Sequence, residues 1–180
     1  MIVRDSRIED LDAVLAIKRD PNVANLQYKF DEKEYATFLR KTLQGENKNG
    51  IVTTQFSSIE QENEIIGYVR HDHYSKNGTN MVECSFNLSS TFWGQGKMKS
   101  ALTVLINQWM ENGSVQHVFA DHFRRNSRCE RLLTGLQFDH QPISALERLY
   151  TVLQQQCFHW IIRRRLDASE WTQTRTANSM

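Results

Sequence analysis

The 180-residue sequence predicts one α+β domain in which helices flank a mixed, mostly antiparallel central sheet. Two amphipathic helical segments lie near the N-terminus, three strand-like segments form a meander in the middle, and helices alternate with strands afterwards. Hydrophobic residues make up 39% of the chain and charged residues 24%, which is typical of a folded protein with a sizeable core. We expect one domain over residues 1–171 and a polar tail at 172–180.

The first third of the chain is predicted to form a strand and two helices. Residues 2–4 are a strand candidate, and residues 5–19 follow with helical spacing that ends before Pro21. Apolar positions of this helix are Ile8, Leu11, Val14, Leu15 and Ile17. Asp31 is the expected N-cap of the second helix, which has acidic residues in its first turn. Its apolar side carries Tyr35, Phe38, Leu39 and Leu43, and a polar break follows at 45–50.

The middle of the chain reads as an antiparallel meander. Its strand candidates are residues 51–59, 64–74 and 81–89. The second connection contains Asn77-Gly78, a pair that is typical of a tight hairpin turn.

The last part alternates helices with strands. A helix with Met98, Ala101, Leu102, Leu105 and Trp109 on one face is expected to stop at Gly113. A strand at 115–123, a helix at 126–136 capped by Asn126 and a strand at 157–166 follow. The segment between Phe138 and residue 157 fits either a strand or a short helix, and the sequence does not decide between them.

Charge and cysteine content exclude or disfavour several classes of protein. The formal net charge of +1 argues against a broad nucleic-acid or membrane-binding face. No run approaches the roughly 20 apolar residues of a membrane span, and the acidic, amphipathic start is unlike a signal peptide. Cys84, Cys129 and Cys157 lack paired spacing, which favours reduced thiols in a cytoplasmic protein. His71 and His73 share a strand face, but no spacing completes a metal site, so no metal is expected.

The segment FWGQGKMKSA at 92–101 has the composition of a phosphate-binding loop. Glycines at a strand-to-helix junction let a ligand approach the backbone N–H groups, and the helix dipole adds partial positive charge there. Lys97 and Lys99 add two cations. The segment lacks the GK[ST] ending of a nucleoside-triphosphate loop and the GxGxxG of a dinucleotide site. Taken alone, it is equally compatible with a simple turn before a helix.

Its surroundings resemble the GNAT superfamily of N-acetyltransferases, and the RimJ/RimL branch in particular. VECSFNLSSTFWGQGKMKSAL is similar to the branch's acetyl-CoA-binding segment, and VFADHFRRNSRCERLLTGLQF to the segment that follows it. In the first segment Glu83, Phe86, Leu88, Trp93, Gly94, Gly96 and Ala101 match, and in the second Ala120, Asn126, Arg131, Leu132, Leu133, Leu136 and Phe138. The opening VRDSRIEDLD, the strand GYV at 67–69 and the ending LDASEW also resemble the family.

This resemblance implies a sheet whose central strands splay apart to hold acetyl-CoA as cosubstrate. The backbone of Asn87, Leu88 and Ser89 is expected to pair with the pantetheine arm like an added strand. The loop around the pyrophosphate is expected to comprise Trp93, Gly94, Gln95, Gly96, Lys97, Met98, Lys99 and Ser100, and Asn126 to contact the cofactor arm. Candidates for the 3′-phosphate are Arg124, Arg125, Lys97 and Lys99, with no choice among them.

Three residues are candidates for the acid–base chemistry of amine acetylation. Glu83 lies on the strand beside the expected cleft, and Glu147 falls near the segment where RimL-like enzymes are thought to have a catalytic Glu. Cys129 stands where that branch has a Ser proposed to protonate the leaving thiolate. Each has a structural alternative: exposed carboxylates for the two Glu residues and a small packed side chain for Cys129. The Tyr that many GNAT enzymes use as general acid is replaced by Leu133.

The sequence therefore predicts an acetyl-CoA-dependent N-acetyltransferase that works by direct attack in a ternary complex. The acceptor is a protein N-terminal α-amine, a polyamine or another small amine, and a homodimer is conceivable. A non-catalytic acyl-CoA-binding or regulatory domain on the same fold is the alternative from a different class. A small nucleic-acid-binding domain is disfavoured by the net charge of +1.

Overall fold

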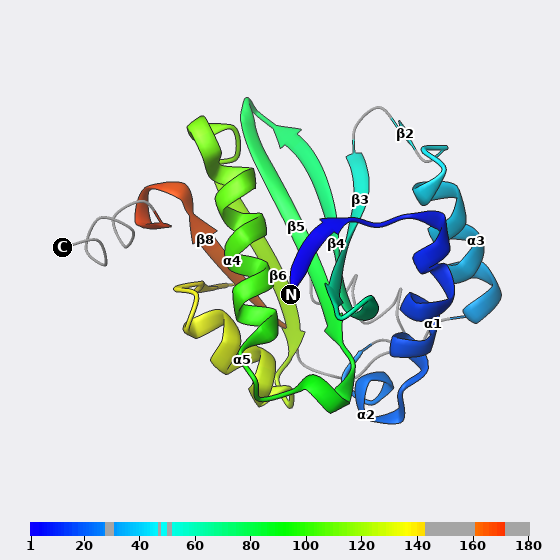
Figure 1. Cartoon of the computed structure of the whole chain (residues 1–180). Helices are drawn as coiled ribbons and strands as arrows, with labels where there is room; N and C mark the ends of the chain where they lie inside the picture. The colour runs from blue at the N-terminus through cyan, green and yellow to red at the C-terminus, as the bar shows by residue number, and fades with distance from the viewer. Residues whose placement is uncertain (28–30, 47, 50–51, 143–160, 172–180) are drawn as a thin grey trace.

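The computed structural model describes residues 1–27, 31–46, 48–49, 52–142 and 161–171 (Figure 1). Its strands are β1 (Ile2–Asp5), β2 (Lys48–Asn49), β3 (Val52–Gln61), β4 (Glu64–Lys76), β5 (Thr79–Leu88), β6 (His117–Phe123), β7 (Asp139–Gln141) and β8 (Ile161–Asp167). Its α-helices are α1 (Leu11–Arg19), α2 (Pro21–Ala24), α3 (Glu32–Leu43), α4 (Lys97–Met110) and α5 (Ser127–Thr134). Short 3₁₀ helices are η1 (Ile8–Asp10), η2 (Ser90–Phe92) and η3 (Glu111–Gly113).

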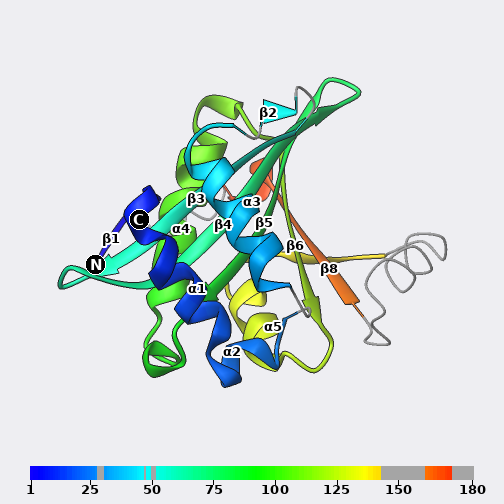
Figure 2. The same cartoon turned by 90° about the vertical axis from the view of Figure 1, so that its right-hand side faces the viewer.

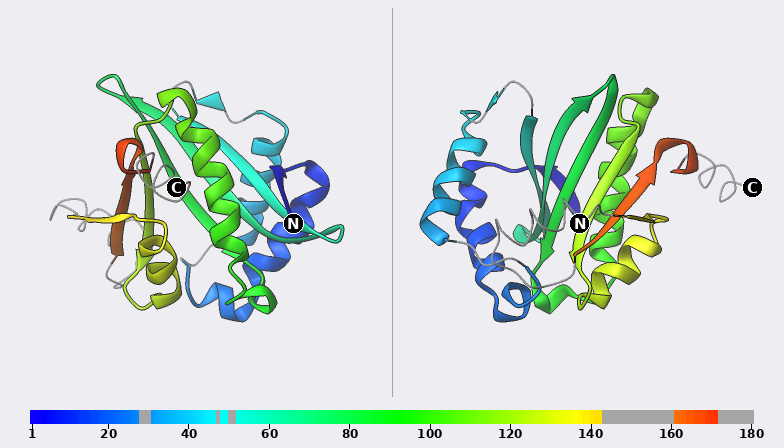
Figure 3. Two further views of the ribbon diagram at one scale, coloured as in Figure 1. Left: turned by 60° about the vertical axis from the view of Figure 1, so that its left-hand side comes forward. Right: turned by 180° about the vertical axis from the view of Figure 1, so that it is seen from behind.

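The strands form one mixed sheet with the order β1-β3-β4-β5-β6-β8-β7, and β2 pairs with β3. The β5–β6 pair is parallel, while the other neighbours are antiparallel. Helices α1 and α3 cover one face, and α4 lies across the other (Figures 1 and 3). This three-layer arrangement confirms the predicted α+β fold with a mostly antiparallel sheet.

Two apolar clusters, one on each face, hold the layers together. Val69, Val82 and Val118 of the sheet pack with α4, in which Leu102 and Ile106 have no exposed surface. On the other face, Val14 of α1 and Leu39 of α3 pack against Phe56 and Tyr68. Because burial of a side chain of this size contributes roughly 1.5–3 kcal/mol, these clusters fix how the helices dock on the sheet.

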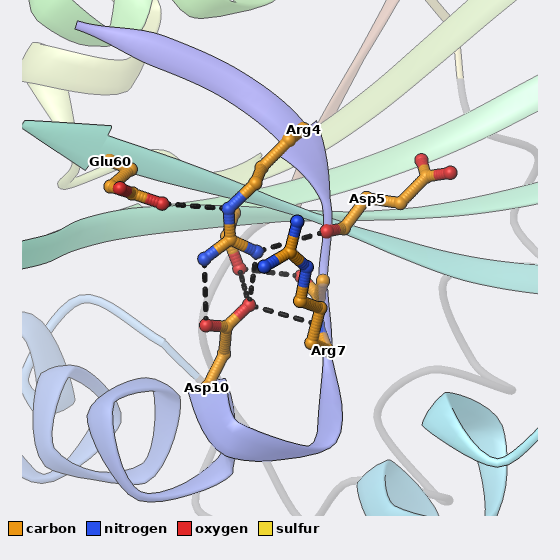
Figure 4. A network of polar contacts seen from close by, with 7 residues as sticks. Arg4, Asp5, Arg7, Asp10 and Glu60 are labelled. Atoms are coloured by element: carbon orange, nitrogen blue, oxygen red, sulfur yellow. Dashed lines mark hydrogen bonds and ion pairs between the residues drawn. The ribbon is translucent and has the colours of Figure 1, made fainter. Parts of the chain in front are cut away.

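A polar network fastens β1 and the first turn to the edge of the sheet (Figure 4). The Arg4 guanidinium donates to both oxygens of Asp10, at 2.8 and 3.0 Å, and to Glu60 at 2.7 Å. Asp10 also accepts from the Arg7 backbone and the Ser58 hydroxyl. Burial opposes ionisation of Asp10, but these hydrogen bonds outweigh it and hold the pKa of Asp10 below its usual range.

This network explains one difference from the sequence prediction. The helix predicted over 5–19 is split, because Asp5 ends β1 and Asp10 is drawn into the network, so α1 starts at Leu11 after a 3₁₀ turn. By contrast α3 has the predicted cap, with the Asp31 carboxylate accepting from the Glu34 N–H at 2.9 Å.

The two hairpins of the meander both turn through left-handed residues. Asn77 and Gly78 have φ of 54° and 77°, as expected for the predicted turn. Glu62 and Asn63 have φ of 54° and 65° and make an equivalent turn that contains no glycine. The strands are longer than predicted. The tight turns start the β3–β4 pairing at Gln61↔Glu64 and the β4–β5 pairing at Lys76↔Thr79, and the β3–β4 register shifts once, at a bulge between Ile59 and Glu60.

Later elements follow the prediction with shifted ends. β6 begins at His117 instead of residue 115. The segment after Phe138, for which the sequence did not decide between strand and helix, begins with the strand β7. The remainder of that segment, the start of the predicted last strand and the tail at 172–180 lie outside the described residues. Among the helices that the structure describes, none is long and apolar enough to cross a membrane.

Candidate active site

The site is built around a split between two parallel strands. β5 and β6 pair only from Met81↔His117 to Cys84↔Ala120, so the last four residues of β5 have no partner strand on that side among the described residues. Figure 2 shows β5 and β6 diverging beyond this point. The edges of a sheet carry unsatisfied N–H and C=O groups, so the split exposes hydrogen-bonding backbone in the middle of the molecule.

Strand geometry shows which backbone groups face the split. The Ser89 N–H donates to Ile66 O at 2.9 Å, toward β4. Since successive N–H groups point to opposite edges of a strand, the N–H groups of Leu88 and Phe86 face the split and that of Asn87 faces β4. The Leu88 carbonyl accepts from the Trp93 indole N–H at 2.8 Å. Of the three residues predicted to pair with pantetheine, Leu88 therefore has its N–H directed at the split.

The loop before α4 presents a row of unsatisfied N–H groups. Gly94 and Gly96 have φ of 77° and 73°, and Gly96 is the N-cap of α4 with no side chain to satisfy the first turn. Within the part of the chain that the structure describes, no acceptor meets the backbone N–H groups of residues 94–99. A β-carbon at Gly96 would meet nothing within 4 Å, so the approach to these groups is open. Such a helix start attracts anions.

Side chains of the predicted loop residues play different parts. Met98 is 7% exposed and packs in the core, so only its backbone faces outward. The Gln95 amide donates to Thr91 O at 3.2 Å, which closes the loop on itself. Lys97 donates to Gln61 and lies 5.6 Å from the Phe92 ring centre, whereas Lys99 is exposed.

One cavity of about 600 Å³ connects this loop with the opposite face of the sheet. Its first end lies at the starts of α4 and α5, and is lined by Gly94, Gly96, Lys97, Lys99, Asn126, Arg128 and Arg131. Its second end lies beside α1 and α3, and is lined by Lys18, Gln27, Tyr35, Tyr68, Arg70 and Asp121. Phe86, Asn87 and Leu88 line the passage between them, so the cavity runs through the split.

Cationic side chains gather at the first end. Arg128 and Arg131 line it, together with the two lysines, and the Arg128 guanidinium lies 4.7 Å from the Trp93 ring centre. Of the earlier 3′-phosphate candidates, Arg125 donates to Asn25 O at 2.6 Å, and Arg124 is exposed outside the cavity lining. The two α5 arginines were missed because their helical position, facing the loop, depends on how α5 docks beside α4.

Cys129 and Asn126 stand at the start of α5. Asn126 caps the helix through its side-chain oxygen, which accepts from the Cys129 N–H at 3.1 Å, and both residues line the cavity. Burial raises the pKa of the Cys129 thiol to about 12. The thiol therefore keeps its proton at neutral pH and can donate a hydrogen bond, but it is not a thiolate nucleophile.

Glu83 lies at the vertex of the split, on the face of β5 that points away from α4. Glu83 lies opposite Asp72 of β4 and opposite Phe119 of β6. The next pair, Cys84↔Ala120, is the last one between β5 and β6. Burial, followed by the negative charge of Asp121, raises the pKa of Glu83. Its side chain is outside the cavity lining, whereas its neighbour Ser85 and also Asp121 line the cavity. A carboxylate with a raised pKa beside a cavity is suited to general-base chemistry.

His122 of β6 is a further residue of this region. It is 5% exposed, lines the cavity, and lies close enough to Phe123 O for Nδ1 to donate at 3.0 Å. No described group meets its Nε2 atom. Burial lowers the pKa of His122, so the ring is neutral at pH 7. Leu133, at the family's Tyr position, is fully buried in the core.

The remaining residues singled out from the sequence are Glu147, the cysteines, His71 and His73. Glu147 lies outside the described residues, so its candidate role stays a prediction. Cys84 and Cys129 are free thiols. His71 and His73 contact one another and Trp109, and the described residues contain no group of three His, Cys, Asp or Glu arranged for a metal ion.

Comparison with known proteins identifies the family. The acetyltransferase (GNAT) domain model matches residues 1–139. The chain belongs to the GNAT family of N-acetyltransferases. This confirms the family resemblance and the predicted enzyme class, and GNAT membership agrees with the sheet split at its centre. No curated protein sequence matches the chain.

Several solved structures share the fold at low sequence identity. A ribosomal-protein-S5-alanine acetyltransferase from Vibrio fischeri superposes with a TM-score of 0.74 at 17% identity, over 94% of this chain and 93% of that one. RimJ from Mycobacterium smegmatis, solved with CoA-disulfide, gives 0.70 at 13% identity, over 93% and 82%. A RimL acetyltransferase of ribosomal L7/L12 gives 0.70 at 12%, over 92% and 88%. The RimJ/RimL-like fold assignment is thereby confirmed.

Proposed function

We propose that this GNAT protein transfers the acetyl group of acetyl-CoA to a primary amine, by direct attack in a ternary complex. The observation that carries the proposal is the cavity, which joins an anion-attracting helix start on one face of the sheet to a separate chamber on the other. Two substrates can therefore enter from opposite faces and meet at the split. Positioning two reactants in this way supplies much of the acceleration of a bimolecular reaction.

The first end of the cavity fits acetyl-CoA. The N–H groups of residues 94–99 and the Lys97 and Lys99 side chains suit the pyrophosphate, and Arg128 or Arg131 suits the 3′-phosphate. The unpaired edge of β5 suits the amides of the pantetheine arm, and Asn126, which lines the same cavity, suits a further contact with that arm. The N–H of Leu88 or Phe86 would then polarise the thioester carbonyl.

Glu83 is the proposed general base. An attacking amine must lose a proton, and a free α-amine has a pKa of about 7.7–8.0. Because burial and Asp121 raise the pKa of Glu83, its carboxylate is a stronger base than an ordinary Glu. Its position outside the cavity lining implies that a water molecule relays the proton past Ser85.

Cys129 is the proposed hydrogen-bond donor to the departing sulfur. Its pKa of about 12 makes full proton transfer to a thiolate of pKa about 8.5 unfavourable. A hydrogen bond from the buried S–H still stabilises the negative charge as it forms. The final proton then comes from the conjugate acid of the base or from solvent.

The acceptor class follows in part from the structural relatives. Enzymes named for acetylating ribosomal-protein alanine share the fold, which favours an α-amine of a protein or a small amine as acceptor. In this proposal the protein requires neither a metal nor nucleic acid.

A turnover assay tests the proposal. CoA release is measured with acetyl-CoA and a panel of peptide α-amines, amino acids and polyamines, for the natural protein and for Glu83→Gln. We expect turnover with at least one amine, and a loss of roughly 10²–10⁴-fold in kcat for Glu83→Gln. Tight acetyl-CoA binding without turnover of any amine would instead support a non-catalytic acyl-CoA-binding domain.

A further inference from the structure

Two polar side chains of β5 lie on the α1 and α3 side of the split with unused hydrogen-bonding atoms. Ser85 and Asn87 are alternate residues of the strand, so both point to the same face of the sheet. This is the face covered by α1 and α3, because Asn87 lies opposite Tyr68 of β4, which packs in the cluster beneath those helices. Both residues line the cavity. No described group meets the Ser85 hydroxyl or the Asn87 side-chain oxygen.

A buried pair of phenols orients the Asn87 amide. Its Nδ2 donates to the Tyr68 hydroxyl at 2.8 Å, and Tyr68, which is 1% exposed, also hydrogen-bonds to Tyr35. Burial, and then Tyr35, raises the pKa of Tyr68 well above its ordinary value, whereas burial raises the pKa of Tyr35 and the bond to Tyr68 opposes that rise. This pattern indicates that Tyr68 donates its single proton to Tyr35 and accepts from Asn87. The Asn87 oxygen is therefore directed away from β4, where the cavity lies.

The two acceptor atoms flank the place expected for the thioester. The backbone N–H groups that face the split alternate along β5 with Ser85 and Asn87. Ser85 is the first residue of β5 beyond its last pair with β6, Cys84↔Ala120. Side chains two residues apart on a strand start about 6.5–7 Å from one another. Both can therefore reach one nitrogen atom that lies between them, at hydrogen-bond distances of about 2.9 Å.

We propose that the Ser85 hydroxyl and the Asn87 amide oxygen bind the attacking amine, each accepting one of its two N–H groups, and that the protein thereby selects primary amines. This inference rests on the proposed acetyl transfer and adds the residues that orient the acceptor. With both N–H groups bound, the nitrogen lone pair points to the carbonyl in the split. Since both side chains are uncharged, they do not favour the unreactive ammonium form as a carboxylate would. A secondary amine has one N–H and leaves one acceptor atom unused.

Turnover of matched primary and secondary amines tests this assignment. The acceptors are the tripeptide Ala-Ala-Ala and butylamine, each compared with its N-methyl form, so that a protein-like α-amine and a small amine are both represented. We expect kcat/KM for the primary member of at least one pair to exceed that of the secondary member by about tenfold or more.

Substitutions separate hydrogen bonding from steric exclusion of the methyl group. Asn87→Leu has a similar size but no acceptor atom, so the preference should fall by about two- to tenfold through slower reaction of the primary amine alone. Asn87→Asp retains an acceptor oxygen and should retain most of the preference. Ser85→Ala should lower the preference and Ser85→Thr should retain it, while the acetyl-CoA KM stays unchanged in all four. Asn25→Ala, at an exposed asparagine outside the cavity lining, is the matched control and should behave like the natural protein.

Calorimetry with two inert bisubstrate compounds separates this inference from the proposed function. In each compound a CH2–C(=O) group joins the CoA sulfur to the nitrogen of alaninamide, which carries a hydrogen in one compound and a methyl group in the other. The N–H compound should bind about two- to tenfold more tightly, and the double variant Ser85→Ala/Asn87→Leu should remove this difference.

The outcomes distinguish the two proposals. Turnover without a preference for primary amines, or with a preference that survives both Asn87→Leu and Ser85→Ala, overturns the inference alone. Absence of turnover together with a binding difference that the double variant removes overturns the proposed catalysis alone. Absence of both turnover and the binding difference overturns both.

Discussion

Acidification is expected to destabilise the protein through one buried histidine. His71 is 4% exposed and lies between the sheet and α4, where its ring centre is 5.1 Å from that of Trp109. Its Nε2 lies 3.1 Å from the Ser57 hydroxyl, and its Nδ1 lies 2.7 Å from Nε2 of His73. Protonation would place a charge in this apolar layer, next to a second imidazole.

The size of the effect follows from linkage. Burial, followed by the proximity of His73, lowers the pKa of His71 to about 3, whereas an unfolded histidine titrates near 6.5. Between these values the unfolded chain binds more protons than the folded one, so the free energy of unfolding falls as the pH falls. At about 1.4 kcal/mol per pH unit below 6.5, His71 alone removes about 2 kcal/mol by pH 5. Burial also lowers the pKa of His73, which acts in the same direction.

Urea denaturation at pH 7.5 and pH 5.0 measures this loss. The natural protein should lose about 2 kcal/mol more than His71→Asn over this interval, although the variant will be less stable at pH 7.5 because a packed ring is removed. His140→Asn, at an exposed histidine of β7, is the matched control and should follow the natural protein. Parallel losses in the natural protein and His71→Asn would refute the assignment of acid sensitivity to this core histidine.

Three further substitutions test the split and its loop. Gly96→Val forces a β-branched residue to φ near 73°, at a cost of about 1–2 kcal/mol in stability. Acetyl-CoA affinity measured by calorimetry should fall at least tenfold. Unchanged affinity would refute the proposal that this loop binds the pyrophosphate. In Gly67→Ala the new β-carbon would lie 2.8 Å from a Leu88 methyl and 2.9 Å from Asn87 O, so thermal denaturation should show a loss of about 1–3 kcal/mol together with weaker acetyl-CoA binding. Normal stability and binding would show that the split tolerates the shift. Cys129→Ala should lower kcat, measured from initial rates, without moving the acidic limb of the pH profile of kcat. An unchanged kcat would exclude the thiol from catalysis.

Elements specified by neighbouring residues were predicted well from the sequence. Asp31 caps α3 as expected, and the glycine loop before α4 lies at the expected junction, because caps and tight turns depend on a few adjacent residues. The first helix was misplaced because its start depends on Asp10, whose partner Ser58 is far away in the sequence. A connection between the first two strands of the meander was predicted, but its tight turn at Glu62-Asn63 was not, because the turn lacks the glycine that usually marks such a turn.

The site divides in the same way. The end of β5 and the loop before α4 come from one continuous segment and were predicted together, whereas Arg128 and Arg131 of α5, which line the same end of the cavity, were missed. The chamber combines Lys18 from α1, Tyr35 from α3 and Arg70 from β4, and nothing in the sequence relates these residues until the helices dock on the sheet. Glu83 was predicted to lie beside the cleft, but its raised pKa depends first on burial in the folded protein and then on Asp121, which a different strand supplies.

The short pairing between β5 and β6 has a mechanical consequence. Four residue pairs join the half of the sheet formed by β1, β3, β4 and β5 to the half formed by β6, β8 and β7. Helix α4 packs on both halves, since Val69 and Val82 on one side and Val118 and Leu166 on the other belong to the same cluster as its buried residues. The packing of α4 against both halves therefore sets the angle between them. The width of the passage between β5 and β6 therefore depends on the volumes of the buried side chains between α4 and the sheet. Substitutions in this core can change how well a ligand fits without changing any residue that contacts the ligand.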